Sequence, residues 1–139
     1  MKESFAKAIM KPIDSLPLIQ GEIADYRLSE EGILYSYSKP PVRTIENISS
    51  NVRLVKHITG GRKVPLLIYL SKSPVPDKAT RQFAREQLPE IYTAMAMVSQ
   101  PGLSQLIMRI LFSMQKPPIP MKSFTEAEKA REWLLQYVQ

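Results

Sequence analysis

The chain has 139 residues, a hydrophobic fraction of 44%, a charged fraction of 23% and a net charge of +6, so its size and composition suit one globular domain with its own core. The absence of cysteine excludes disulfides, thiolate metal sites and a cysteine nucleophile, and it fits a reducing compartment. The basic residues are scattered from Lys2 to Arg131 without a long run, which favours a generally basic, solvated surface over a nucleic-acid-binding stretch.

The first 20 residues are predicted to be a lead-in, and residues 21–139 to form a single domain. Residues 1–10 have an amphipathic pattern that is too short and too interrupted for the apolar region of a signal peptide. No stretch approaches the ~18 apolar residues of a membrane span. We therefore expect a cytoplasmic protein.

A β-hairpin is predicted to open the domain. Alternating apolar residues favour strands at 22–28 and 33–37, and the turn between them ends in Gly32, which tolerates the positive φ of a tight turn. The Lys39-Pro40-Pro41 segment ends the hairpin because proline cannot donate to a strand ladder.

The next three elements are a helix at 44–58, a strand at 64–70 and a helix at 77–88. Apolar residues recur at helical spacing in the first, and Gly60-Gly61 supplies a left-handed stop. The nearly continuous apolar run at 64–70 is typical of a central strand that is covered on both faces. The second helix is expected to begin after an N-cap at Asp77 and to end at Pro89.

The C-terminal part continues the alternation of strand and helix. The predicted elements are a strand at 94–99, a helix at 103–114, a strand at 121–124 and a helix at 125–138. Thr125 and Glu128 have the spacing of a capping box at the start of the last helix. Its buried stripe is expected to comprise Ala127, Ala130, Leu134 and Tyr137. The order β-β-α-β-α-β-α-β-α predicts an α/β domain with an N-terminal hairpin, a mostly parallel central sheet and helices packed on it.

This order of elements resembles the STAS domains, the anti-sigma-factor-antagonist class with the SpoIIAA-like fold. More narrowly, it resembles small bacterial STAS-like and Sec14-like proteins. The matching landmarks are Gly32-Ile33-Leu34, Leu66-Leu67-Ile68-Tyr69-Leu70, Ala79-Thr80-Arg81-Gln82-Phe83, Ala94-Met95-Ala96-Met97-Val98 and the segment from Phe124 to Leu134. The resemblance covers roughly residues 23–138 and implies fold more than function.

The resemblance also implies one residue that this chain does not have. In the antagonists an Asp-Ser pair follows the third strand, starts the second helix and carries the phosphorylated serine. Here Asp77 and Lys78 occupy the pair, so the acceptor serine is missing. Regulation by phosphorylation at that position is therefore not implied for this chain.

No motif in the sequence predicts catalysis. His57 is the only histidine and lies near the end of a predicted helix, where a cation or donor suits the helix C-terminus. The Gly60-Gly61-Arg62-Lys63 segment lacks the glycine spacing and the Ser/Thr of a phosphate-binding loop. The acidic residues are interpreted as solvated and capping groups and not as ligands of a metal ion. We therefore expect a protein that is not an enzyme and that needs no metal and no cofactor.

A basic group on the second helix is the first candidate binding site. Lys78, Arg81 and Arg85 have the spacing of one helix face, and Lys72 precedes them. A helix N-terminus attracts anions through its free N–H groups. The hypothesis is a contact site for an acidic partner or a phosphate group, and the alternative is a solvated basic face.

An apolar face on the helix at 103–114 is the second candidate. Met108, Leu111 and Phe112 widen its apolar stripe beyond what one sheet can cover. The hypothesis is that this face meets another subunit, a hydrophobic ligand or a membrane surface. The alternative is burial under residues 1–10 or under the proline-rich loop at 117–120.

Two functions follow from this sequence, from different classes. The first is a non-catalytic regulatory or protein-interaction module of the STAS-like class, with an unidentified protein partner or a second copy of the chain. The alternative is a small domain that binds an apolar ligand or lipid, as the Sec14-like resemblance implies. An apolar pocket of several hundred Å³ would favour the alternative. Nucleic acid is the least expected partner, because aromatic residues do not interleave with the basic ones.

Overall fold

The structure is a computed structural model that describes residues 10–103, 106, 109 and 116–139. The predicted helix at 103–114 therefore falls mostly outside the described residues, although the three that are described within it are helical. Met108, Leu111 and Phe112, which were predicted to form an apolar face, lie outside the described residues, as does the amphipathic pattern of the N-terminus.

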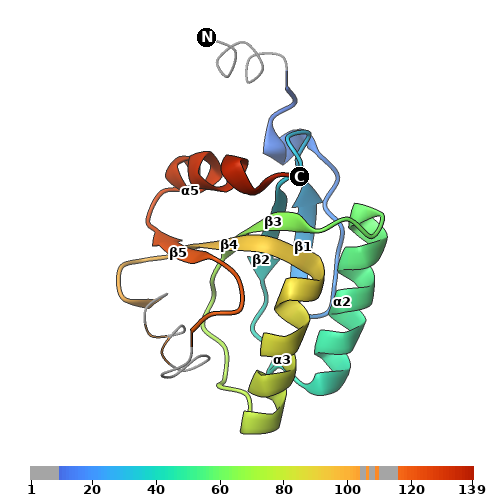
Figure 1. Cartoon of the computed structure of the whole chain (residues 1–139), viewed down its shortest axis with the longest axis vertical. Coiled ribbons are helices and arrows are strands. Elements are labelled where there is room, and N and C mark those ends of the chain that lie inside the picture. Colours follow the sequence, from blue (N-terminus) through green and yellow to red (C-terminus); the bar gives the residue numbers. More distant parts are fainter. Residues whose placement is uncertain (1–9, 104–105, 107–108, 110–115) are drawn as a thin grey trace.

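A five-stranded sheet forms the centre of the domain (Figure 1). Its strands are β1 (Ala24–Leu28), β2 (Leu34–Ser38), β3 (Val64–Tyr69), β4 (Tyr92–Val98) and β5 (Met121–Phe124). They are arranged in sequence order, with β1 antiparallel to β2 and every other neighbouring pair parallel. The predicted α/β fold, with an N-terminal hairpin and a mostly parallel sheet, is confirmed.

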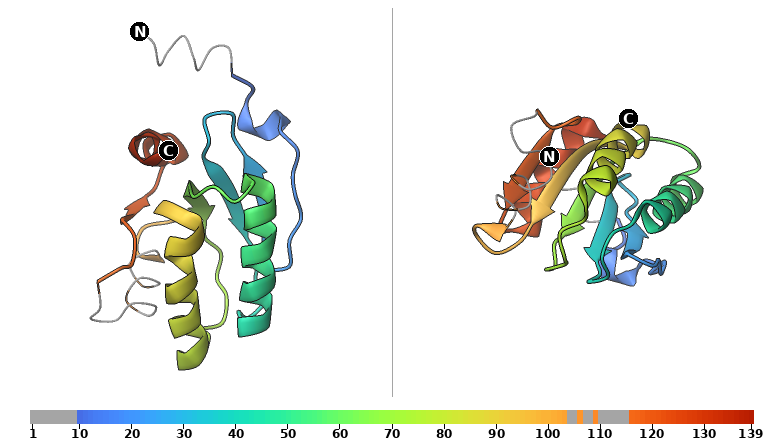
Figure 2. Two further views of the ribbon diagram at one scale, coloured as in Figure 1. Left: turned by 45° about the vertical axis from the view of Figure 1, so that its right-hand side comes forward. Right: turned by 90° about the horizontal axis from the view of Figure 1, so that it is seen from below.

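Helices cover both faces of this sheet, as Figures 1 and 2 show. The helices that the structure describes from end to end are α2 (Ile45–Thr59), α3 (Lys78–Ile91) and α5 (Ala127–Leu134), and two short 3-10 turns occupy Ile13–Ser15 and Leu135–Tyr137. α2 and α3 pack side by side on one face, and α5 lies on the other. Each face therefore has its own apolar core.

The central position of β3 in the sheet explains why its sequence is apolar without alternation. It lies between β2 and β4, so both of its faces are covered. Leu66 belongs to the core beneath α2 and α3, and its neighbour Leu67 belongs to the core beneath α5. The prediction of a mid-sheet strand between two helix layers is confirmed.

Local capping groups set the ends of α2. The Thr44 hydroxyl accepts a hydrogen bond of 3.1 Å from the backbone N–H of Asn47, and the Asn47 side chain accepts one of 2.7 Å from the backbone N–H of Thr44. This is a capping box with an amide in place of the usual carboxylate. At the other end Gly60 has φ 66°, the left-handed conformation that stops a helix.

The prediction that α3 ends at Pro89 is wrong, because the helix continues to Ile91. Proline lacks a backbone donor and its ring crowds the carbonyl four residues earlier, so the extension past Pro89 has a local cost. Ile91 is buried in the core beneath α2 and α3, which favours the extra turn. As a result β4 begins at Tyr92, two residues before the predicted strand.

The predicted capping box of Thr125 and Glu128 is also wrong. α5 begins at Ala127, after an N-cap at Glu126 that makes no side-chain capping bond. The Glu128 carboxylate instead accepts hydrogen bonds from Arg131, whose Nη1 lies 2.6 Å from the carboxylate of Glu31. The contact between Arg131 and Glu31 ties α5 to the turn between β1 and β2, and the Glu128 side chain bonds Arg131 within the helix.

Candidate functional site

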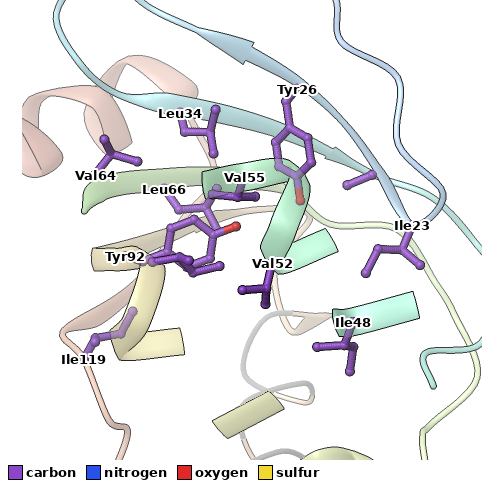
Figure 3. Close-up of a cluster of buried hydrophobic side chains, with 12 residues drawn as sticks. Ile23, Tyr26, Leu34, Ile48, Val52, Val55, Val64, Leu66, Tyr92 and Ile119 are labelled. Atoms are coloured by element: carbon purple, nitrogen blue, oxygen red, sulfur yellow. The ribbon is translucent and has the colours of Figure 1, made fainter. Parts of the chain in front are cut away.

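A cavity of about 470 Å³ lies between the sheet and the helices α2 and α3. Strands β1 to β4 form its floor, α2 and α3 form its walls, and residues 71–76, which follow β3, form part of its rim. Figure 3 shows part of this layer, with Ile48 and Val52 of α2 across from the strand residues Tyr26 and Leu66. Most of the lining is apolar, so the cavity suits an apolar or amphiphilic occupant.

Small side chains on the floor make room for the cavity. Ala24 of β1 pairs with Ser38 of β2, and Tyr26 of β1 pairs with Ser36 of β2, so two serines and an alanine lie on neighbouring strands of one face. A core normally fills such positions with branched aliphatic residues that interdigitate with the facing helix. Here the short side chains leave space under α2.

Buried hydroxyl groups line the same part of the floor. The Tyr26 hydroxyl donates a hydrogen bond of 2.8 Å to the Asn51 side chain, and it also lies within hydrogen-bonding reach of Tyr92 and Ser36. In Figure 3 the hydroxyls of Tyr26 and Tyr92 both point into the space between the sheet and α2. Burial raises the pKa of each phenol, so both are neutral donors at ordinary pH.

Arg43, just before α2, contributes a positive charge to the cavity wall. Its Nη2 donates a bond of 3.0 Å to the Ile23 carbonyl and one of 2.9 Å to the Ser38 hydroxyl. Its Nη1 donates to the carbonyls of Lys39 and Pro41. All four of these acceptors are neutral, and burial lowers the pKa of the guanidinium because the charged form loses hydration.

The rim of the cavity lies at the carboxyl ends of β2 and β3. The Ser71 hydroxyl donates a bond of 3.0 Å to the Ser38 carbonyl and so holds the start of the rim against β2. Lys72 follows and lines the cavity from an exposed position. In sheets of this kind, ligands bind at the carboxyl ends of the parallel strands.

The four basic residues that the sequence grouped together have different surroundings in the structure. Only Lys72 lines the cavity, whereas Lys78 is exposed at the first position of α3. Arg81 donates a bond of 2.7 Å to the Pro76 carbonyl, and Arg85 donates one of 2.6 Å to the Lys116 carbonyl. These two side chains thus fasten α3 to the segments beside it, and an anion contact at the group stays a prediction.

Asp77 performs the predicted capping role at the start of α3. Its carboxylate accepts a hydrogen bond of 2.8 Å from the backbone N–H of Thr80. Hydrogen bonds from Thr80 lower the pKa of this carboxyl group, because they stabilise its charged form. The Asp-Lys pair is therefore an ordinary helix start.

Sequence reasoning missed the residues that define the cavity, above all Arg43, Ser36, Ser38 and Asn51. The sequence did contain a signal for the two serines. When helices cover both faces of a sheet, neither face is open to solvent, so polar residues in β2 are unexpected. Two inward serines in a covered strand indicate a packing defect or a site. Arg43 gave no such signal, because its contact with the Ile23 carbonyl joins residues 20 positions apart in the chain.

Comparisons with known proteins support the fold. A crystal structure of a DUF3478-family protein with a SpoIIAA-like fold, from Shewanella loihica PV-4, is similar over 86% of this chain and 92% of that one. The TM-score is 0.52 and the sequence identity is 16%, so the likeness concerns the fold alone. No curated protein matches the sequence.

The described helices are too short or too polar for any of them to cross a membrane. The sequence family described as "Domain of unknown function (DUF7793)" matches residues 26–138, which include every described strand from β2 onward and the helices α2, α3 and α5. With its SpoIIAA-like fold, the chain belongs to this DUF7793 family.

Proposed function

We propose that this domain is a non-catalytic binding module that holds a small apolar or amphiphilic ligand between the sheet and the helices α2 and α3. The observation that carries the proposal is the cavity of about 470 Å³, which lies within the roughly 300–1,000 Å³ typical of ligand sites. Its largely apolar lining with a few convergent polar groups is the usual composition of such sites.

The arrangement of short side chains on the floor of the cavity favours a ligand site over a chance gap in the packing. The short side chains of Ala24, Ser36 and Ser38 lie on adjacent strands and open one continuous space. Well-packed cores seldom leave a space of this size, and a function that needs the space accounts for it.

The chemistry of the lining supports binding without catalysis. Among the described lining residues, the titratable groups are Tyr26, Tyr92, Arg43 and Lys72, with no carboxylate or histidine to serve as a general base near neutral pH. The hydroxyl and amide groups can orient a polar head group by hydrogen bonds.

A regulatory or protein-interaction role, which the STAS resemblance implies, stays a prediction. The cavity favours the ligand-binding alternative that the Sec14-like resemblance implies. The two roles are compatible, since a ligand in the cavity would touch both α2 and α3 and would change the surface that a partner meets.

A filled-cavity variant tests the proposal. Ala84 lies on α3 and lines the cavity, so Ala84→Leu places three extra carbons into it. We expect this change to weaken binding of the neutral fluorescent probe Nile red by about tenfold or more, because overpacking leaves less room for a ligand. Fluorescence titration measures the affinity.

Ala79→Leu is the matched control, because Ala79 is exposed on the same helix and does not line the cavity. It should leave the affinity unchanged. Equal affinities of wild type and Ala84→Leu, or no binding to wild type, would contradict the proposal. Mass spectrometry of an organic extract of the purified protein adds a second readout, in which a retained apolar molecule is expected from wild type and is reduced in Ala84→Leu.

A further inference from the structure

We infer that the ligand of this cavity is an anionic amphiphile, with its charged head beside Arg43 and Lys72 and its tail along the apolar floor toward α3. The inference rests on the proposed function and adds the chemical class of the ligand. Its basis is a positive charge in the cavity wall that none of the described acidic residues balances.

Arg43 carries the positive charge in the wall of the cavity. The Arg43 side chain is half-buried, and a charge that loses part of its hydration is normally paired with an opposite charge, because desolvation of a lone ion is costly. No described acidic side chain lies within ion-pair distance of Arg43, and its four hydrogen-bond acceptors are three carbonyls and a hydroxyl. Asp25, on the nearby strand β1, is paired with Lys39 at 3.0 Å. A ligand anion would supply the missing charge.

Lys72 adds a second positive charge on the same side of the cavity. Ser38 connects the two, because its hydroxyl accepts from Arg43 and its carbonyl accepts from Ser71, the residue before Lys72. The described lining contains these two cations and no acidic side chain. The potential in this part of the cavity is therefore positive, which favours an anion.

The cavity is polarised along the strand direction. Arg43 and Lys72 follow the carboxyl ends of β2 and β3, and α2 and α3 begin at this same end, where helix dipoles also favour negative charge. Ile91, at the end of α3, and Met95, in the first half of β4, line the other end. A ligand with a charged head at the basic end of the cavity and an apolar tail at the other end would match both ends.

A charge series of ligands with one tail tests the inference. Decanoate, decanol and decylamine share a tail and differ in the head group, which is anionic, neutral and cationic near neutral pH. Displacement of Nile red from the wild-type protein gives their relative affinities. We expect decanoate to bind at least about tenfold more tightly than decanol, since hydrogen bonds to charged groups exceed neutral ones by about this factor. Decylamine should bind most weakly.

Three substitutions locate the head group. Arg43→Gln should reduce the affinity for decanoate to within roughly threefold of that for decanol, the part that Lys72 retains, and leave decanol binding in place. Lys72→Met should weaken decanoate binding by roughly threefold, the scale of an exposed ion pair. Lys56→Met is the control, because Lys56 is exposed on α2 away from the cavity lining and should have no effect.

The outcomes separate the inference from the proposed function. Binding of all three ligands with equal affinity would keep the ligand site and overturn the anionic class, as would a preference for decylamine. An unchanged decanoate affinity in Arg43→Gln would likewise overturn it. Failure of every ligand and of Nile red to bind wild type would contradict the proposed function itself. If circular dichroism shows that Arg43→Gln does not fold, the wild-type series and Lys72→Met decide.

Discussion

Tyr26, Tyr35 and Tyr92 are buried, and burial raises the pKa of each phenol above its ordinary value of 10.0. In the unfolded chain these groups lose their protons near that ordinary value, whereas in the folded chain they keep them to higher pH. The unfolded state therefore binds fewer protons than the folded state above about pH 10, and the free energy of unfolding falls as pH rises there. Below that pH the contribution of these tyrosines is fully present.

We expect urea titrations to show a steady loss of stability as the pH is raised above about 10. Tyr92→Phe should make this loss shallower, because it removes one of the shifted groups and keeps the ring in the core. Circular dichroism at a series of alkaline pH values provides the measurement. A pH dependence identical in wild type and Tyr92→Phe would contradict the assignment.

Residue-scale roles were predictable from sequence where they depend on near neighbours. Asp77 caps α3, and Gly60 ends α2, because each acts within a few residues of itself. Arg43 contacts the Ile23 carbonyl, 20 positions earlier in the chain, and so no local pattern identifies this contact. The same holds for Asn51, whose partner Tyr26 lies 25 positions earlier in the chain.

At the scale of the elements, two threonines provide a matched comparison. Thr44 and Thr125 both precede a helix, but only Thr44 accepts a capping hydrogen bond. Thr44→Ala should lower the free energy of unfolding by about 1 kcal/mol, whereas Thr125→Ala should change it little. Urea unfolding of both variants checks this, and equal losses would show that the cap contributes nothing distinctive.

The bounds of the elements deviate from the sequence pattern where distant contacts outweigh local preference. α3 continues through Pro89 because Ile91 gains a place in the core. α5 starts later than its capping pattern predicts because Glu128 and Glu31 share Arg131. By contrast, β5 has the predicted bounds, and the hairpin turn has Gly32 at φ 94°, the conformation that its local sequence favours.

For the molecule as a whole, β3 is the element on which the architecture depends. Leu67 is 0% exposed in the core beneath α5. Leu67→Ala should lower the free energy of unfolding by about 2–5 kcal/mol, the usual range for a buried leucine. Val42→Ala, at a position 46% exposed, should stay within about 0.5 kcal/mol of wild type. Similar effects of the two changes in urea unfolding would contradict the central place of β3.

The sequence predicted the fold class and the mid-sheet position of β3, because the alternation of strand and helix and the apolar run are both strong periodic signals. It did not predict the cavity. A cavity depends on which small residues come together across strands, so Ala24, Ser36 and Ser38 reveal it only once the register of β1 against β2 is known.

The sheet also keeps the two cores apart, and this has a consequence for how the family can diversify. The core beneath α5 includes buried residues from β2, β3 and β4 together with Ala130 and Leu134 of α5, and the cavity does not reach it. Substitutions around the cavity can therefore retune ligand preference while the packing on the α5 side stays intact. Relatives with this architecture are expected to vary most on the α2 and α3 side, and a protein engineer seeking a new specificity would begin there.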